Sequence, residues 1–297
     1  MNTSLHRSGC ARALAPRSLA WVVLALAASG CQAAQVIGRA AMSDGVEVPI
    51  PADLRARTDE AEARGATIYA LDRAAAISTD EVIEESGRDN PANLGGWITY
   101  GERNQPDSLL TEFYTDTDPP RVAFRVRVSS LTGVVSSLER VDPTQPIDPT
   151  RLILWRARQT AIASLQDFPQ TLNSVLIPAP DDSVYVYLLA ASTQPDVAVL
   201  GQHHRFKIAG ADGTTILEKT ALTNTALELP LRPVKDPSEA ILFVTHVVTD
   251  YPLETHVFAS FLYRRTLCVI TERGVWTVIA GKISYLGTRE AVLGPDQ

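Results

Sequence analysis

The sequence predicts an α+β protein in which a helix packs on a mainly antiparallel sheet. Three local patterns point to this class. Residues 121–128 alternate between an apolar set and a set with three arginines, as expected for a strand with one buried face. Asp148 and Pro149 precede a stretch of helically spaced apolar residues, which is typical of a helix start. Asp212 followed by Gly213 lies between two strand-like segments and indicates a hairpin turn.

The first structured segment is predicted at residues 51–85, which are rich in alanine, glutamate and arginine. Apolar residues recur there on one helical stripe, formed by Leu54, Ala61, Ile68, Ala75 and Val82. Gly65 interrupts this stripe, and residues 67–71 are also compatible with a short strand. We therefore expect two helical segments in this region.

Strands follow the helical region. Segments rich in β-branched and aromatic residues predict strands at 97–100, 109–115, 122–128 and 133–138. The DPP sequence at residues 118–120 predicts a turn between the second and third of these strands.

A second helix is predicted from Thr150 to Leu165, packed on the sheet through Leu152, Trp155 and Ile162. Further strands are predicted after it at 175–177, 184–189, 205–209 and 214–219. A helix followed by several antiparallel strands resembles the cystatin-type or PepSY-type layout. This resemblance is architectural and implies no functional residues.

The last section is also predicted to be rich in strands. Residues 241–248 are apolar on both faces, which predicts a central strand. Residues 267–271 and 275–279 are expected to pair across a loop in which Gly274 allows a positive φ. Residues 288–297 are expected to form a polar tail.

The beginning of the chain carries an export signal. Arginines precede an apolar run, residues 18–30, that ends in small residues, which is the pattern of a secretory signal. The sequence Ala28-Ser29-Gly30-Cys31 resembles the lipobox of bacterial lipoproteins. This resemblance implies cleavage before Cys31 and a diacylglycerol on its thiol. The alternative is an ordinary cleaved signal that leaves Cys31 as a free thiol. Gln32 resembles the residue that directs lipoproteins to the outer membrane, facing the periplasm.

The domain organisation follows from these segments. We expect a signal peptide at 1–30, a tether at 31–50 and a single body at 51–297. The alternative is two lobes, 51–141 and 149–297, because prolines interrupt regular structure between them.

The charge of the mature chain excludes some partners. Residues 31–297 carry 24 basic and 34 acidic side chains, since three of the 27 basic residues lie before Cys31, and their formal charge is −10. An acidic surface disfavours nucleic acid and disfavours a polybasic contact with lipid. Membrane contact is therefore expected through the acyl chains. If Cys31 is lipidated, Cys268 is the other remaining cysteine and no internal disulfide forms.

Common catalytic motifs are absent from the sequence. It contains no GxSxG, no GxxxxGK[ST], no HExxH and no CxxC, and it implies no cofactor and no assigned catalytic residue. Four histidines remain after residue 31. His203 and His204 are adjacent and point to opposite faces of a regular strand, so only one of them can join a given site. Strand geometry predicts His204 at the edge of the core and His203 in solvent.

Two classes of function are consistent with these observations. The first is a lipid-anchored cell-envelope lipoprotein whose body is a non-catalytic binding or accessory module for an envelope protein. The alternative is a metal-binding protein or hydrolase that uses His204, His246, His256 and Glu254, because imidazoles and a carboxylate suit zinc. The segments HHR at 203–205, PLETHVF at 252–258 and VWTVIAGKI at 275–283 loosely resemble uncharacterised secreted proteobacterial proteins, which implies no activity.

Overall fold

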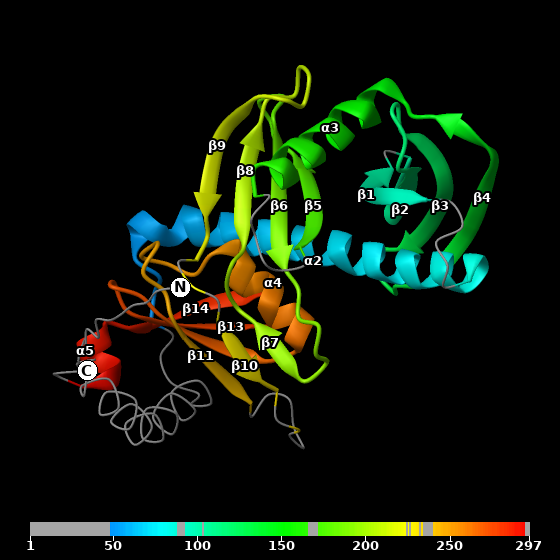
Figure 1. Cartoon of the computed structure of the whole chain (residues 1–297). Coiled ribbons are helices and arrows are strands. Elements are labelled where there is room, and N and C mark those ends of the chain that lie inside the picture. Colours follow the sequence, from blue (N-terminus) through cyan, green and yellow to red (C-terminus); the bar gives the residue numbers. More distant parts are fainter. Residues whose placement is uncertain are drawn as a thin grey trace, which may run out of the picture. The chain divides into compact units, whose positions relative to one another are not determined.

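The computed structural model describes residues 48–87, 93–102, 104–165, 172–223, 225, 227–231, 233 and 240–294 (Figure 1). The chain divides into two units, residues 1–44 and 45–297, and every described residue belongs to the second unit. The predicted signal peptide, Cys31 and residues 31–47 of the predicted tether therefore lie outside the described residues. Val48, near the end of the predicted tether, forms an antiparallel bridge with Tyr285.

The first element is one continuous helix, α2 (Ala52–Ser86, 35 residues), so the expectation of two helical segments was wrong. Gly65 belongs to the buried stripe of this helix. A Cβ atom added at Gly65 would lie 2.5 Å from Cβ of Val257 and 2.6 Å from the carbonyl oxygen of Glu254. The glycine thus permits a close contact with a second helix and does not break the first one.

The first sheet is an antiparallel meander in the order β1-β2-β3-β4. Its strands are β1 (Leu94–Glu102), β2 (Gln105–Thr115), β3 (Arg121–Ser129) and β4 (Val135–Pro146). The alternation predicted for β3 is confirmed, because its apolar residues Val122, Phe124, Val126 and Val128 are at most 1% exposed. Helix α2 packs on one face of this sheet, where Ile68, Leu71 and Val82 join its core.

The second helix is α3 (Pro149–Ala163), and Asp148 caps it as predicted. The Asp148 carboxylate accepts hydrogen bonds from the backbone N–H groups of Thr150 at 2.9 Å and Arg151 at 3.3 Å. The buried face differs in part from the predicted one. Trp155 is buried as expected, but Leu152 and Ile162 are only partly buried, and the rest of the buried face consists of Leu154, Ala157, Arg158 and Ala161. Small alanines there let the helix lie close to the sheet.

The second sheet is also antiparallel, in the order β5-β6-β8-β9. Its strands are β5 (Leu172–Pro178), β6 (Val184–Ala190), β8 (His204–Ile208) and β9 (Ile216–Ala221). Gly213 has a φ of +75° in the loop between β8 and β9, which agrees with the predicted hairpin. Helix α3 shares a core with residues of both sheets, including Ile98 and Val122 of the first and Val186 and Phe206 of the second.

The third sheet has the order β11-β12-β13-β14. Its strands are β11 (Ile241–Thr245), β12 (Thr266–Ile270), β13 (Val275–Ile279) and β14 (Lys282–Gly287). The central strand predicted at 241–248 is instead an edge strand that ends at Thr245. It is parallel to β12. A parallel neighbour requires a crossover connection, and the unpredicted helix α4 (Glu254–Tyr263) supplies it.

Two small elements complete the fold. Strands β7 (Val197–Val199) and β10 (Glu228–Pro230) form a two-stranded antiparallel sheet. A short helix, α5 (Arg289–Leu293), lies in the predicted polar tail. The Thr288 hydroxyl begins it by accepting a hydrogen bond from the N–H of Ala291 at 3.3 Å.

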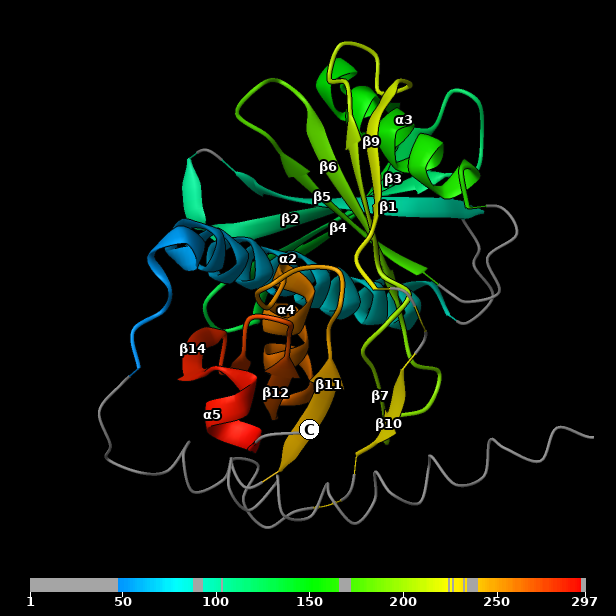
Figure 2. The ribbon, with the colours of Figure 1, turned by 90° about the vertical axis from the view of Figure 1, so that its left-hand side faces the viewer.

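The described body is therefore α+β with mainly antiparallel sheets, as predicted. Figures 1 and 2 both show α2 between the first two sheets on one side and α4 with the third sheet on the other. One core contains side chains of α2 and of the first and second sheets, and another contains side chains of α4, β12, β13 and β14. In the described part of the chain, no helix combines the length and apolarity needed to cross a membrane.

Candidate functional site

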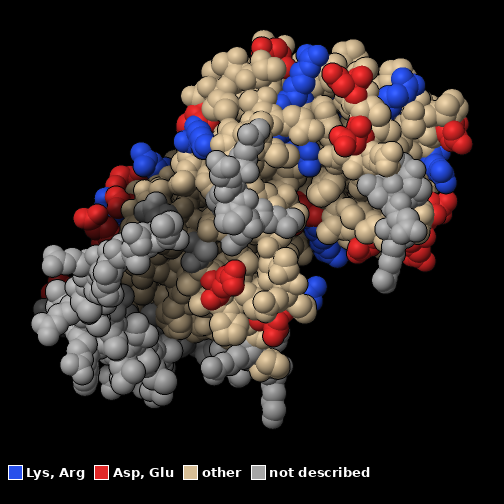
Figure 3. Space-filling model, in the orientation of Figure 1, with Lys and Arg blue, Asp and Glu red and all other residues tan. Residues whose placement is uncertain are grey.

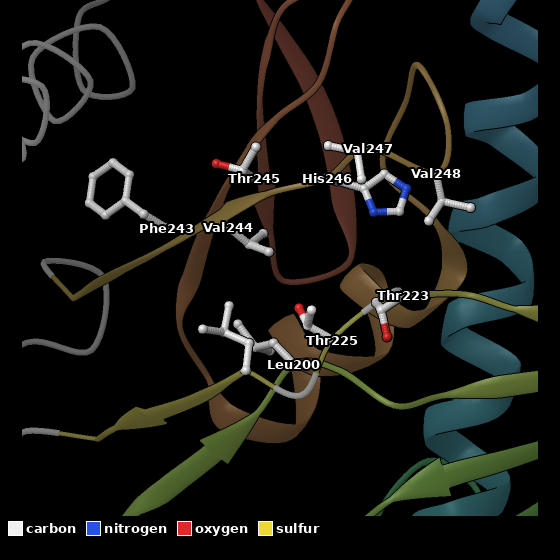
Figure 4. Close-up of a pocket in the computed structure, with 10 residues that line it drawn as sticks. Leu200, Thr223, Thr225, Phe243, Val244, Thr245, His246, Val247 and Val248 are labelled. Carbon is white, nitrogen blue, oxygen red and sulfur yellow. The ribbon is translucent and has the colours of Figure 1, made fainter. Parts of the chain in front are cut away.

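The candidate site is a cavity of about 360 Å³ along β11. Six consecutive residues, from Phe243 to Val248, line one side of it, and Leu200, Thr223, Thr225 and Leu227 line the other. Figure 4 shows Val244 and Leu200 on opposite sides of the hollow, with His246 at the end nearest Thr223. The cavity thus follows a strand edge.

The main chain of β11 offers hydrogen-bonding groups to this cavity. The N–H of His246 donates to the carbonyl oxygen of Ile270 at 2.8 Å, so this residue faces β12. In a parallel ladder, alternate residues bond to the neighbouring strand and the others turn their N–H and C=O groups away. Phe243 and Thr245 therefore direct their main-chain groups to the outer edge. Among the described residues, no strand pairs with that edge.

The side chains of the site have two characters. Val244 and Leu200 are 6% and 4% exposed and belong to the same apolar cluster, and Leu227 packs against it. Thr225 and Thr245 are exposed. The site therefore has an apolar floor on the α4 side of the sheet and an open, uncharged rim.

His246 is held in one tautomer at the end of the cavity. Its Nε2 lies 2.9 Å from the Thr249 hydroxyl oxygen, and that hydroxyl donates its proton to the Tyr251 carbonyl oxygen at 2.6 Å. The imidazole must then donate from Nε2, which leaves Nδ1 as an acceptor. Burial lowers the pKa of His246 to about 4, although Glu254 opposes this shift. The ring is neutral at neutral pH.

His256 contacts His246 behind the cavity. The two rings lie edge to face with centroids 4.8 Å apart. Nδ1 of His256 accepts a hydrogen bond from the N–H of Leu253 at 2.9 Å and so caps the first turn of α4. Its Nε2 is buried without a hydrogen-bond partner among the described residues. Burial, followed by the neighbouring His246 and His203, holds the pKa of His256 well below its usual range.

Of the two adjacent histidines, His203 is buried although it was predicted in solvent, whereas His204 lies at the edge of the core as predicted. His203 is 2% exposed, and its Nδ1 accepts a hydrogen bond from the N–H of Ala190 at 3.1 Å. His204 is half-buried in the first position of β8. The alternation of a regular strand does not apply to His203, because it precedes the strand. Burial, with a smaller contribution from His204, lowers the pKa of His203 to about 4.

Glu254 is the centre of a buried ionic network. It is 3% exposed. Its Oε1 accepts hydrogen bonds from the Tyr187 hydroxyl at 2.9 Å and from Nη1 of Arg205 at 2.8 Å. Nη1 of Arg64, on α2, lies 3.9 Å from the same oxygen. The carboxylate therefore connects α4 with α2, β6 and β8.

The residues of the predicted metal site are only partly brought together. His246 and His256 are in contact, Glu254 is bound by Arg205 and Tyr187, and His204 lies on β8. Within the described ranges, no group of three or more His, Cys, Asp or Glu side chains is placed to hold a metal ion. Cys268 is fully buried, as its apolar strand predicts, and burial raises the pKa of its thiol to about 12.

The outer surface is mixed in charge. Figure 3 shows Lys and Arg intermingled with Asp and Glu on the face it presents. Exposed pairs such as Lys207 with Asp181 and Lys282 with Glu62 illustrate this mixing. The visible part of the described surface thus offers no extended basic area for a polyanion.

Comparisons with known proteins give little to set beside this geometry. No protein-family model matches the chain, and no curated protein matches it. Among solved structures, the Bacillus megaterium YpeB C-terminal domain is similar with a TM-score of 0.16 and 10% sequence identity, over 62% of this chain and 70% of that one. A likeness at that TM-score carries no argument about function.

Proposed function

We propose that this chain is a lipid-anchored cell-envelope protein whose body binds a segment of a partner protein in the cavity along β11. The observation that carries the proposal is the cavity itself, which combines an apolar floor with a strand edge that no other described strand covers. Sites of this kind, concave and mostly apolar with a few polar groups, are typical of binding. The described residues present no group of side chains beside it that could hold a metal ion.

The anchor in this proposal is Cys31, and the expected location is the outer membrane, facing the periplasm. The support is the sequence alone, in the lipobox-like residues before the cysteine and in Gln32 after it. Diacylglycerol together with a further acyl group would suffice for stable attachment. Replacing Cys31 by Ala should move the protein from the membrane fraction to the soluble fraction. Retention of the substituted protein in the membrane would contradict the anchor.

The binding site is tested by filling the cavity. The exposed Thr225→Trp substitution places an indole in the hollow without removing a buried side chain. The matched control is the exposed Thr215→Trp substitution, which lies just before β9, at the opposite end of that strand. A library of random eight-residue peptides displayed on phage is selected against the immobilised full chain. We expect enriched peptides that lose binding to the Thr225 variant and keep it with the Thr215 variant.

Two results would contradict the binding proposal. One is a library that yields no enriched peptide on the full chain. The other is a set of enriched peptides whose affinity is the same for both tryptophan variants, which would place binding outside the cavity.

A further inference from the structure

We infer that the partner segment binds by strand addition, pairing its own main chain with the outer edge of β11. This inference rests on the proposed function and states how the same cavity recognises its ligand. Its physical basis is the outward N–H and C=O groups of Phe243 and Thr245, which line the cavity and pair with no strand among the described residues. Such a row of main-chain groups is complementary to one kind of ligand, another extended main chain.

The composition of β11 differs from that of β9, the edge strand of the second sheet. Natural proteins usually protect a sheet edge with charges, proline or bulges. The edge strand β9 carries Glu218 and Lys219, and its pairing with β8 contains a register shift. Strand β11, with the sequence ILFVT, has no charge and no proline, and its pairing with β12 is regular over all five residues. This edge is therefore built to accept a strand.

The walls of the cavity define which side chains the added strand would carry. A strand added beside β11 lies about 4.8 Å from it, and alternate side chains point to opposite faces. Those on the α4 side would meet Leu200, Leu227 and Val244, which form an apolar wall. Two residues further along, the next inward side chain would meet Thr223 and Nδ1 of His246, an acceptor. The preferred segment thus has an apolar residue, then any residue, then one with a hydrogen-bond donor.

A second copy of this chain is a poorer occupant than a partner's peptide. Pairing two β11 edges about a twofold axis would join only five residues from each chain. Stable dimers bury on the order of 800 Å² per partner, far more than a strand of this length provides. A single extended peptide does not need so large an interface. Its main chain pairs with the edge of β11, and its side chains occupy the cavity.

The test compares main-chain and side-chain changes at one position. Thr245→Pro removes the N–H that faces the outer edge, whereas Thr245→Ala keeps that N–H and removes only the exposed side chain. Proline is tolerated at an edge position whose N–H faces outward. The peptides enriched on the full chain are measured on both variants by fluorescence anisotropy. We expect at least a fivefold loss of affinity for the proline variant, equivalent to one hydrogen bond, and less than a twofold change for the alanine variant.

A second measurement leaves the protein unchanged. The same peptides are synthesised with N-methyl groups on either of the two alternating sets of amides. Only one set faces β11 in a paired strand, so methylation of that set should weaken binding about tenfold or more, and methylation of the other set should change it little.

The outcomes separate this inference from the proposed function. If the Thr225→Trp variant blocks binding but both N-methylated sets bind equally, the cavity is the site and strand addition is wrong. If the full chain dimerises in sedimentation experiments and Thr245→Pro abolishes the dimer, the occupant is a second copy and the partner inference is overturned. Strand addition by a partner segment is supported if one N-methylated set of peptides loses binding and the proline variant also loses binding.

Discussion

Replacing His203 by Asn should reduce the acid sensitivity of the folded body by an amount that follows from the structure. The side chain is 2% exposed, and burial lowers its pKa from about 6.5 to about 4. The His203 ring is therefore protonated below about pH 6.5 in the unfolded chain, but only below about pH 4 in the folded chain. Stability contributed by the neutral ring is present above pH 6.5 and is lost as the pH falls toward 4.

The expected magnitude is about 1.4 kcal/mol per pH unit across this window, or about 3 kcal/mol in total. Asparagine keeps an acceptor for the N–H of Ala190 but takes up no proton. The variant should therefore be less stable than the natural protein at pH 7.5 and should lose about 3 kcal/mol less between pH 7.5 and pH 4.

Urea unfolding of both proteins at several pH values, followed by the fluorescence of buried Trp276, measures this difference. Comparing the two proteins cancels the titration of all other groups that the substitution leaves unchanged. Parallel curves of unfolding free energy against pH would refute the reasoning, because they would show that the His203 ring titrates alike in both states.

Three further predictions concern stability at neutral pH, each measured by urea unfolding. Burial raises the pKa of Asp72 to about 6, so its ionised form is disfavoured and Asp72→Asn should stabilise by up to about 3 kcal/mol at pH 7, with little gain at pH 4. Gly65→Ala should destabilise by about 2 kcal/mol despite better helix propensity, because its Cβ would overlap α4, whereas Gly101→Ala, with open space around it, should have little effect. Glu254→Gln should cost about 3 kcal/mol or more, and Glu218→Gln, which removes an exposed partner of the same arginine, less than about 1 kcal/mol; equal losses would contradict the burial argument.

Local patterns were sufficient for the elements whose neighbours are close in sequence. The alternation of residues 121–128 predicts β3 because a meander buries one face of each strand. Asp148 predicts the start of α3 because a cap involves only the next few residues. The α+β class follows from such signals.

The location of the site depends on contacts that no local pattern contains. The apolar composition of residues 241–248 is the same for a central strand and for an edge strand that faces Leu200 and Leu227. From the sequence alone, Gly65 indicates an interruption of the helix. Its role is clear only from its close contact with α4. His203 was predicted in solvent but is buried, because it precedes β8 and the alternation of the strand does not extend to it. The edge position of β11 follows from its parallel pairing with β12, and that pairing depends on the arrangement of the whole fold.

The position of α2 has a consequence for the order in which the chain folds. Near its start, Asp53 pairs with Arg273 at 3.1 Å, and Glu62 accepts hydrogen bonds from Nζ of Lys282 at 2.9 Å and from the N–H of Ile283 at 2.8 Å. The partners in these contacts are 220 or 221 residues apart in sequence. Contacts of such range close large loops and form late. The contacts of α2 with the C-terminal strands therefore form late in folding. The body reaches its final packing only after residues 266–287 have formed their strands and packed against α2.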